Sequence, residues 1–287
     1  MSTVNSHDQA RALRELVSRE RHNMKIISVT SGKGGVGKTS VTVNLALALS
    51  RLGQVVLVVD ADFGLANIDV MLGINSKYNL SHLIKGQRTL DDIIQQGYQG
   101  VRFISGGSGI FELLQMESRQ IDQLVGSLLG LDNAPDVILF DTGAGINENI
   151  LRLVMASSEA IVVTTPEPTA ILDAYALVKT ISRRADAPPV RLIMNKAENR
   201  READNAVFGF QGIIRKYLGI DVEALGCVLF DAEVTKSIKR QTPLLVSHPN
   251  GQTAREIMAV ARRLLQLETG RPTPNNPLSR LFSRVKK

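Results

Sequence analysis

The chain has 287 residues, of which 44% are hydrophobic and 22% charged, so its composition argues against a disordered or collagen-like protein. Its length favours one α/β domain with tails. Its longest apolar runs, such as 55–59, span about five residues, whereas a membrane-spanning helix needs about 20. The first residues lack the apolar core of a signal peptide. Because Cys227 is the single cysteine, no disulfide can form within the chain, and we expect a cytoplasmic protein.

The net charge of +6 is concentrated at the two ends of the chain. Residues 1–25 hold five basic and three acidic side chains, and residues 278–287 hold four basic side chains and no acidic one. The remainder is therefore neutral. Since proteins that bind nucleic acid usually carry their basic excess on the folded body, this distribution makes nucleic acid an unlikely partner. It favours an anionic membrane surface that the tail would meet.

Seven short apolar runs, separated by helix-sized segments, predict buried parallel strands with helices on both faces. The runs are 26–31, 55–60, 101–105, 136–141, 160–165, 190–195 and 224–230. We expect an α/β fold with a doubly wound, mostly parallel sheet of about seven or eight strands and ligand loops at its carboxyl edge. We divide the chain into an N-terminal segment (1–24), a domain (25–269), a Pro- and Gly-containing linker (270–277) and a terminal helix (278–287).

The strongest chemical signal is GKGGVGKT, at positions 32–39, between the first predicted strand and a helical pattern. It fits G-x-x-x-x-G-K-[ST], in which glycines turn backbone N–H groups towards phosphate oxygens. Lys38 is expected to reach the β- and γ-phosphates, and the hydroxyl group of Thr39 is expected to bind Mg²⁺. The residues that we expect to bind the nucleotide here are Gly34, Gly35, Val36, Gly37, Lys38, Thr39 and Ser40.

Acidic residues follow two other predicted strands. Asp60 and Asp62 come at the end of the second strand, where a carboxylate can hold Mg²⁺ or position a water molecule. In DVILFDTGAGI, Asp141 follows an apolar strand as a second candidate for Mg²⁺ ligation. Gly143 and Gly145 would let the next loop approach the γ-phosphate. The alternative for Asp60 and Asp62 is a pair of strand-capping carboxylates.

With Lys33 directly after the first glycine, GKGGVGKT resembles the deviant Walker A motif of the MinD/ParA family of ATPases. The resemblance covers about residues 25–268 and implies a P-loop NTPase of the SIMIBI class. It also implies that ATP joins two copies in a sandwich dimer, and that Lys33 crosses to the partner's phosphates. In the family the second aspartate, here Asp62, positions the attacking water. Lys33, Lys38 and Asp62 are thus the expected catalytic residues, and Thr39, Asp60 and Asp141 the expected Mg²⁺ ligands.

Recognition of the base is expected after the sixth strand, in the sequence MNKAE at positions 194–198. The carboxamide of Asn195 can pair with both the donor and the acceptor on an adenine edge. The same sequence also resembles the guanine-reading motif of GTPases, with Glu198 in place of the usual aspartate. The family resemblance favours ATP, and the remaining alternative is that Asn195 caps the strand end.

Within the family, three segments look most like flagellar-number regulators: DADFGLANIDVMLG, DTGAGI and PEPTAILDAYALVK. The N-terminal D-Q-A-x-x-L-R resembles the segment by which those regulators stimulate an FlhF-like GTPase. The partner-binding residues would be Asp8, Gln9, Ala10, Leu13 and Arg14. Flagellar basal-body components would be further partners. The alternative is a short amphipathic helix that packs on its own domain.

The last ten residues place four apolar side chains at helical spacing beside basic ones. The four are Leu278, Leu281, Phe282 and Val285. This pattern predicts a helix that lies in the interface of the inner face of the cell membrane, with the dimer as the bound form. The alternatives are a frayed basic terminus and a helix docked on its own body.

The cysteine count and the positions of the tyrosines disfavour two other functions of the same fold. An Fe–S carrier needs cluster cysteines, and only Cys227 is present. A tyrosine-kinase relative would carry a C-terminal tyrosine cluster, whereas the last tyrosine is Tyr217. The two alternatives that remain are a MinD-like regulator of the division site and a ParA-like partition ATPase, the latter through a patch at Lys236, Lys239 and Arg240. We expect a Mg²⁺-dependent ATPase that dimerises with ATP and regulates the placement and number of flagella.

Overall fold

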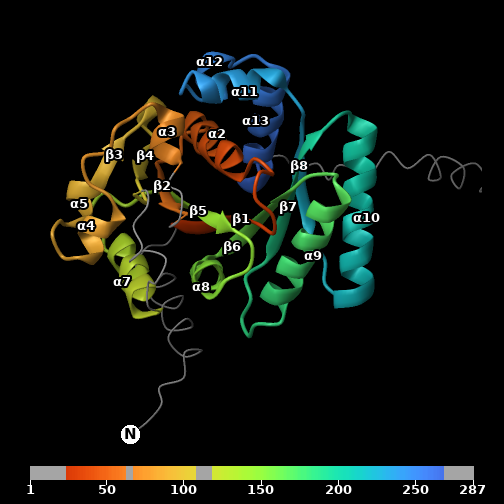
Figure 1. The fold of residues 1–287 in the computed structure, drawn as a ribbon, viewed down its shortest axis with the longest axis horizontal. Coiled ribbons are helices and arrows are strands. Elements are labelled where there is room, and N and C mark those ends of the chain that lie inside the picture. The colour runs from red at the N-terminus through yellow and green to blue at the C-terminus, as the bar shows by residue number, and fades with distance from the viewer. Residues whose placement is uncertain (1–23, 63–66, 108–117, 268–287) are drawn as a thin grey trace, which may run out of the picture.

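The computed structural model describes residues 24–62, 67–107 and 118–267, and these form a three-layer arrangement around one sheet (Figure 1). The sheet has eight strands in the order β3-β4-β2-β5-β1-β6-β7-β8. The strands are β1 (Lys25–Ser31), β2 (Val56–Ala61), β3 (Ile94–Gln96), β4 (Arg102–Ile104), β5 (Val137–Ala144), β6 (Glu159–Thr164), β7 (Val190–Ala197) and β8 (Glu223–Leu229). All neighbouring pairs are parallel except β3 with β4. The expected doubly wound, mostly parallel sheet is confirmed.

Helices cover both faces of this sheet (Figure 1). The described helices are α2 (Lys38–Arg51), α3 (Ile68–Leu72), α4 (Leu80–Ile84), α5 (Leu90–Ile93), η1 (Tyr98–Gly100), α7 (Ser118–Leu129), α8 (Glu148–Ala156), α9 (Pro168–Ser182), α10 (Arg200–Leu218), α11 (Ala232–Lys239), α12 (Leu244–Ser247) and α13 (Gln252–Leu264). One apolar core lies under α2, α3, α12 and α13. Two more lie on the opposite face, one under α4, α5 and α7 and the other under α9 and α10, with α8 contributing to both. None of the described helices is long and apolar enough to span a membrane.

The apolar runs form strands because both sides of each strand are buried. Successive residues of β5 alternate between the two faces: Val137 and Leu139 join the α2 side, and Ile138 and Phe140 the α7 side. A strand with two buried faces is apolar throughout, which is why the sequence pattern was continuous. The sequence pattern did not predict β3, because this strand has only three residues, all at least partly exposed, at the sheet edge.

The strand at the other edge, β8, is protected by side chains from the flanking helices. Arg263 of α13 donates to the carbonyl oxygen of Leu225 at 2.7 Å, and Glu256 of the same helix accepts from the backbone N–H of Leu229 at 2.9 Å. Just before the strand, Gln211 of α10 donates to the carbonyl oxygen of Val222 at 2.7 Å. An edge whose backbone groups are occupied is a poor template for pairing with another chain.

Candidate active site

The GKGGVGKT segment forms a loop between the end of β1 and the start of α2. Gly35 and Gly37 have φ angles of +79° and +91°, which favour glycine. A Cβ atom at Gly32 would lie 2.3 Å from the backbone of Asp173 in α9, so the loop and that helix touch directly. At Gly34 and Gly35 a Cβ atom would instead meet no described atom within 4 Å. The loop therefore has an open side, as a cradle for phosphate groups requires.

A buried ion pair links this loop to the carboxyl-terminal half of β5. The Nζ atom of Lys38 lies 2.9 Å from Oδ1 of Asp141, and the exposed fractions of these side chains are 7% and 0%. The hydroxyl group of Thr42, one helical turn after Lys38, lies 2.9 Å from the same oxygen. The other carboxylate oxygen, Oδ2, is buried and has no hydrogen-bond partner among the described residues. Buried carboxylate oxygens are rarely left unpaired, so Oδ2 is positioned for a ligand.

Asp60 lies beside Asp141, because the two residues are paired in register on β2 and β5. The carboxylate of Asp60 is fully buried and accepts backbone N–H groups from Asp62 at 3.1 Å, Asn67 at 2.8 Å and Ile68 at 3.1 Å. Burial, and then the charge of Asp141, raise the pKa of Asp60 to about 7, although the three backbone N–H groups act in the opposite direction. A bound divalent cation would favour the charged form of Asp60.

Asp62 directly follows β2 and projects towards the last residues of β5. A Cβ atom built on Gly143 would lie 3.5 Å from Oδ1 of Asp62, so the chain after β2 contacts β5 near its carboxyl end. The structure thus brings the phosphate loop, Asp60, Asp62 and Asp141 together at the carboxyl edge of the sheet. The roles of these residues remain predictions.

The donor set suits Mg²⁺ rather than a metal that is held entirely by protein ligands. The described residues contain no group of three or more His, Cys, Asp and Glu side chains that could hold a metal ion. Mg²⁺ commonly takes one or two protein oxygens and completes its shell with water and phosphate. Asp141 Oδ2, with its lack of a described partner, fits that pattern.

Lys33 contacts α9 of its own chain and lies at the surface. Its Nζ atom is 3.1 Å from Oε2 of Glu167 and 2.9 Å from Oγ1 of Thr169, and 40% of its side chain is exposed. Its approach to a partner's phosphates stays a prediction. The sequence pattern did not indicate that Glu167 and Thr169 are partners of Lys33, although both lie in the PEPTAILDAYALVK segment.

Asn195 and Lys196 at the end of β7 hold the phosphate loop from the other side. The amide nitrogen of Asn195 donates to the carbonyl oxygen of Val36 at 2.7 Å, and Nζ of Lys196 donates to that of Gly35 at 2.6 Å. Lys196 has a φ angle of +58°, which is unusual for a residue with a side chain. An asparagine amide has two N–H donors and one acceptor, so the contact with Val36 leaves capacity to pair with a base. Neither Thr42 nor Lys196 was singled out from the sequence.

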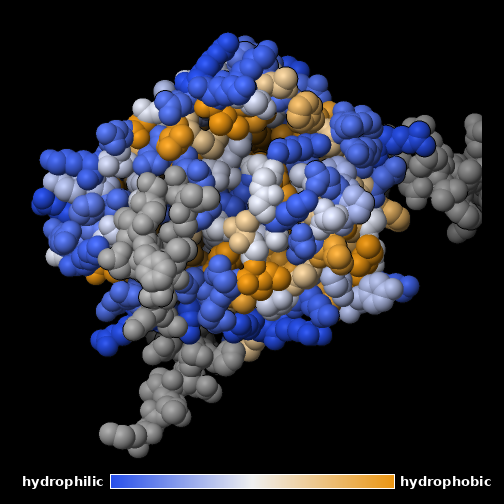
Figure 2. Space-filling view, in the orientation of Figure 1, coloured by the Kyte–Doolittle hydropathy of each residue, from blue (hydrophilic) through white to orange (hydrophobic). Residues whose placement is uncertain are grey.

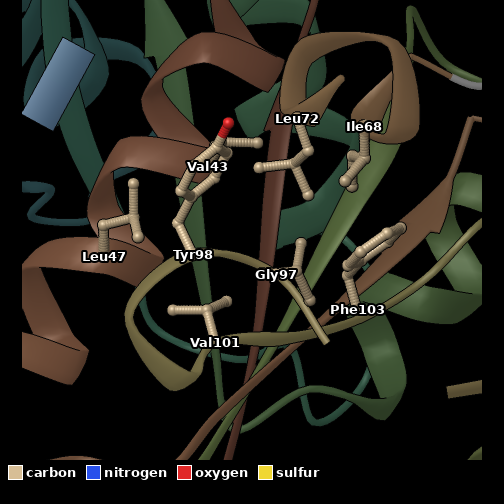
Figure 3. Close-up of a pocket in the computed structure, with 9 residues that line it drawn as sticks. Val43, Leu47, Ile68, Leu72, Gly97, Tyr98, Val101 and Phe103 are labelled. Carbon is tan, nitrogen blue, oxygen red and sulfur yellow. The ribbon is translucent and has the colours of Figure 1, made fainter. Parts of the chain in front are cut away.

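An apolar pocket lies elsewhere, between α2, α3 and β4 (Figure 3). It is lined by Val43, Leu47, Val58, Ile68, Leu72, Gly97, Tyr98, Val101 and Phe103. None of these residues is charged, so the pocket offers hydrophobic packing and no group suited to phosphate or metal binding.

Two groups of predicted residues lie outside the described residues. They are the N-terminal Asp8, Gln9, Ala10, Leu13 and Arg14, and the C-terminal Leu278, Leu281, Phe282 and Val285.

A family model described as "ParA: NUBPL iron-transfer P-loop NTPase" matches residues 22–265. The chain belongs to the MinD/ParA family. It is therefore a P-loop ATPase. That description mentions iron transfer, but this sequence has no cysteine cluster, because Cys227 is its only cysteine.

Relatives within the family cover almost the whole chain. The chain is 35% identical to the antiactivator FleN of Pseudomonas aeruginosa, over 91% of each protein. It is also 35% identical to the flagellum site-determining protein YlxH of Helicobacter pylori, over 92% of this chain and 90% of that protein. A solved structure of the septum site-determining protein MinD of Pyrococcus horikoshii, complexed with Mg-ADP, has a TM-score of 0.71 at 24% identity, covering 85% of this chain and 97% of that one. This last likeness confirms the fold.

Proposed function

We propose that this ATPase hydrolyses ATP with Mg²⁺, switches between a monomer and an ATP-sandwich dimer, and regulates the placement and number of flagella through partner proteins. The observation that carries the proposal is the pair of lysines on one phosphate loop. Lys38 is buried against Asp141, whereas Lys33 lies at the surface on Glu167 and Thr169. The exposed lysine can reach a phosphate group of a second copy, whereas the buried lysine acts within its own subunit.

Lys38 is the cation of the ATP site in this proposal. It exchanges Asp141 for the β- and γ-phosphates when ATP binds, because a polyphosphate offers it more negative charge than one carboxylate. The backbone N–H groups of residues 34–40 surround those phosphates. Thr39, Asp60 and Asp141 would hold Mg²⁺, directly or through water. The ion supplies charge neutralisation at the phosphates when it is bound. The relative complexed with Mg-ADP supports this choice of cofactor.

Asp62 is placed to orient the attacking water. It directly follows β2, next to Gly143 near the carboxyl end of β5. A carboxylate in this position can accept a hydrogen bond from water and hold it in line with the γ-phosphate. The residue would act by positioning this water molecule.

Lys33 supports the dimer. Its bonds to Glu167 and Thr169 are exposed, and exposed ion pairs contribute about 0–1 kcal/mol, so these bonds can be exchanged for a phosphate of a second copy at little cost. Two large apolar side chains are exposed in this part of the chain: Leu172 of α9 is 66% exposed, and Ile146, just before α8, is 44% exposed. Figure 2 shows hydrophobic surface over the region of α8 and α9. We therefore place the dimer contact on the side of the phosphate loop that bears α9.

Asn195 contacts the adenine base in this proposal, with the N–H donor that Val36 does not use. ATP is preferred to GTP because the family binds ATP and because Glu198 replaces the aspartate of the guanine-reading motif.

The terminal segments connect the switch to its outputs. Relatives named as an antiactivator and as a flagellum site-determining protein support a flagellar role. Residues 1–24 would stimulate an FlhF-like GTPase, and flagellar basal-body components would be further partners. Residues 278–287 would bring the cytoplasmic protein to the inner face of the cell membrane in the dimeric state. The alternatives remain a MinD-like regulator of the division site and a ParA-like partition ATPase, and the N-terminal motif separates them from the flagellar function.

Light scattering coupled to gel filtration tests the switch. The full chain is run with ADP and with a non-hydrolysable ATP analogue, each with Mg²⁺ and with or without anionic lipid vesicles. We expect a monomer in ADP, a dimer in the analogue, and vesicle association of the dimer alone. A monomer in both nucleotides would contradict the proposal. Lys33→Ala is the matched variant that should bind the analogue and remain monomeric.

A further inference from the structure

Thr42 is a buried polar residue in contact with the acidic residue of β5. It is fully buried on α2, and its Oγ1 atom lies 2.9 Å from Oδ1 of Asp141 and 3.0 Å from the carbonyl oxygen of Lys38. A threonine hydroxyl has a single proton to donate. Because a carboxylate is a stronger acceptor than a carbonyl group, the contact with Asp141 is favoured.

Thr42 and Lys38 both bind the same oxygen atom of Asp141. Lys38 lies 2.9 Å from Oδ1, as Thr42 does, and Oδ2 has no hydrogen-bond partner among the described residues. With Oδ1 held by two donors, the carboxylate cannot rotate without losing both bonds. Oδ2 is thereby kept available for a ligand that the protein itself does not supply.

The two donors differ in what happens to them when nucleotide binds. Under the proposed function, on which this inference rests, Lys38 leaves Asp141 for the phosphates. Thr42 is then the side chain, among those described, that still holds Oδ1. We propose that Thr42 is a positioning residue that fixes Asp141 after Lys38 has moved, so that Oδ2 faces the water shell of Mg²⁺. The hydroxyl group acts through Asp141 and does not itself touch the nucleotide.

A simpler role for Thr42 is the bond to Lys38 within its own helix. Threonine commonly bonds to the carbonyl group four residues earlier, and Thr180 of α9 does so with Ala176 at 2.8 Å. Such a bond would influence the helix and the phosphate loop regardless of Mg²⁺. The two roles differ in whether removal of the hydroxyl changes Mg²⁺ affinity or nucleotide affinity in general.

Thr42→Val tests the difference because valine has nearly the same shape and lacks the hydroxyl group. The probe is a non-hydrolysable ATP analogue with a fluorescent group on its ribose, bound to the full chain in EDTA and then titrated with Mg²⁺. We expect Thr42→Val to bind the probe in EDTA within twofold of the wild type, and to need about tenfold more Mg²⁺ for the half-maximal fluorescence change. Thr42→Ser, which keeps the hydroxyl group, should restore the wild-type Mg²⁺ requirement. Thr180→Val, which loses a helical hydroxyl bond away from the site, should match the wild type.

Three results would overturn the inference. The first is an unchanged Mg²⁺ requirement in Thr42→Val. The second is an equal loss of probe affinity in EDTA and in Mg²⁺, and the third is no rescue by serine, since either of these would assign Thr42 to the structure of the loop. Circular dichroism and thermal unfolding of each variant show whether it is folded. If the wild type fails to bind the probe at all, the proposed nucleotide-binding function fails instead.

Discussion

The two lysines of the phosphate loop differ in burial and in partner, although they are only five positions apart. Lys38 is 7% exposed and paired with a buried carboxylate, whereas Lys33 is 40% exposed and paired with Glu167 on the surface. A buried cation acts within its own subunit. An exposed cation beside the phosphate site can reach a second molecule. This contrast leads to different expectations for the removal of each charge.

The first prediction compares Lys38→Ala with Lys33→Ala. Lys38→Ala should weaken ATP binding by roughly 10- to 100-fold, because a charged hydrogen bond contributes about 1.5–3 kcal/mol. Lys33→Ala should bind ATP with nearly wild-type affinity but should not form an active dimer. Calorimetric titration measures the affinities, and light scattering with steady-state ATPase assays measures the dimer and its activity. The sandwich model is wrong if Lys33→Ala dimerises and hydrolyses ATP like the wild type.

The second prediction concerns Asp62→Ala. Loss of the carboxylate should lower the ATPase rate by about 10²-fold, because the attacking water is no longer held in line, while ATP binding and dimerisation persist. The phosphate loop and the Lys38–Asp141 pair are not altered by this change. A single-turnover assay in the preformed dimer separates hydrolysis from binding. Wild-type turnover in this variant would remove Asp62 from the reaction.

At the scale of the elements, the strands were predictable because burial on both faces requires continuous apolar runs. Each of the seven predicted runs overlaps one of the strands β1, β2, β4, β5, β6, β7 and β8. β3 was not predicted, because three residues at a sheet edge carry too little pattern to identify a strand.

The site was predictable to the extent that it lies in continuous motifs. The phosphate loop, Asp60 and Asp141 meet because parallel strands end at one edge of the sheet. The contacts of Lys33 with Glu167 and of Thr42 with Asp141 were not predictable, since they join residues that are 134 and 99 positions apart. Such contacts depend on how the elements pack, which the local pattern does not encode.

The third prediction concerns the amino-terminal ends of β6, β7 and β8. Here Arg191 of β7 joins its two neighbouring strands. It forms ion pairs with Glu159 at 2.6 Å and with Glu223, and the side chain of Glu159 is only 7% exposed. Arg191→Ala should lower the free energy of unfolding by about 3 kcal/mol, because it leaves the carboxylate of Glu159 buried without its cation. Urea unfolding measures the change. Arg191→Met combined with Glu159→Leu should cost less, and an equal cost in both variants would show that packing, rather than charge, is responsible.

At the scale of the whole molecule, the proposed function divides nucleotide chemistry from its outputs. All the expected nucleotide and Mg²⁺ ligands lie within the described domain, between Gly34 and Asn195. The segments expected to meet the partner GTPase and the membrane lie at the two ends of the sequence. Changes at either end should therefore alter an output without changing ATP hydrolysis in solution.

The fourth prediction applies this division to the N-terminal segment. Deletion of residues 1–22 should leave ATPase activity and dimerisation intact and should abolish stimulation of an FlhF-like GTPase, because these residues precede the first strand. GTP hydrolysis by the partner is measured with the full chain and with the truncated chain. An undiminished stimulation by the truncated chain would contradict the assignment.

The last prediction concerns the C-terminal segment. Ten helical residues extend only about 15 Å, so this segment can lie in a membrane interface but cannot cross the membrane. Each basic residue near an anionic surface contributes about 1 kcal/mol, and ordering the helix consumes part of that gain. One tail should therefore bind weakly, whereas two tails on one dimer should raise the affinity by roughly 10²-fold or more.

The ATP-bound dimer should therefore sediment with anionic vesicles, and ADP or high salt should release it. Phe282→Glu should prevent binding, because it places a charge in the apolar stripe and opposes the anionic surface. Ser283→Glu, which adds the same charge beside the stripe, is the matched control and should weaken binding less. Equal sedimentation in ADP and ATP would show that dimerisation does not control membrane binding. Equal effects of the two substitutions would show that the tail binds the membrane through its net charge and not through its apolar stripe.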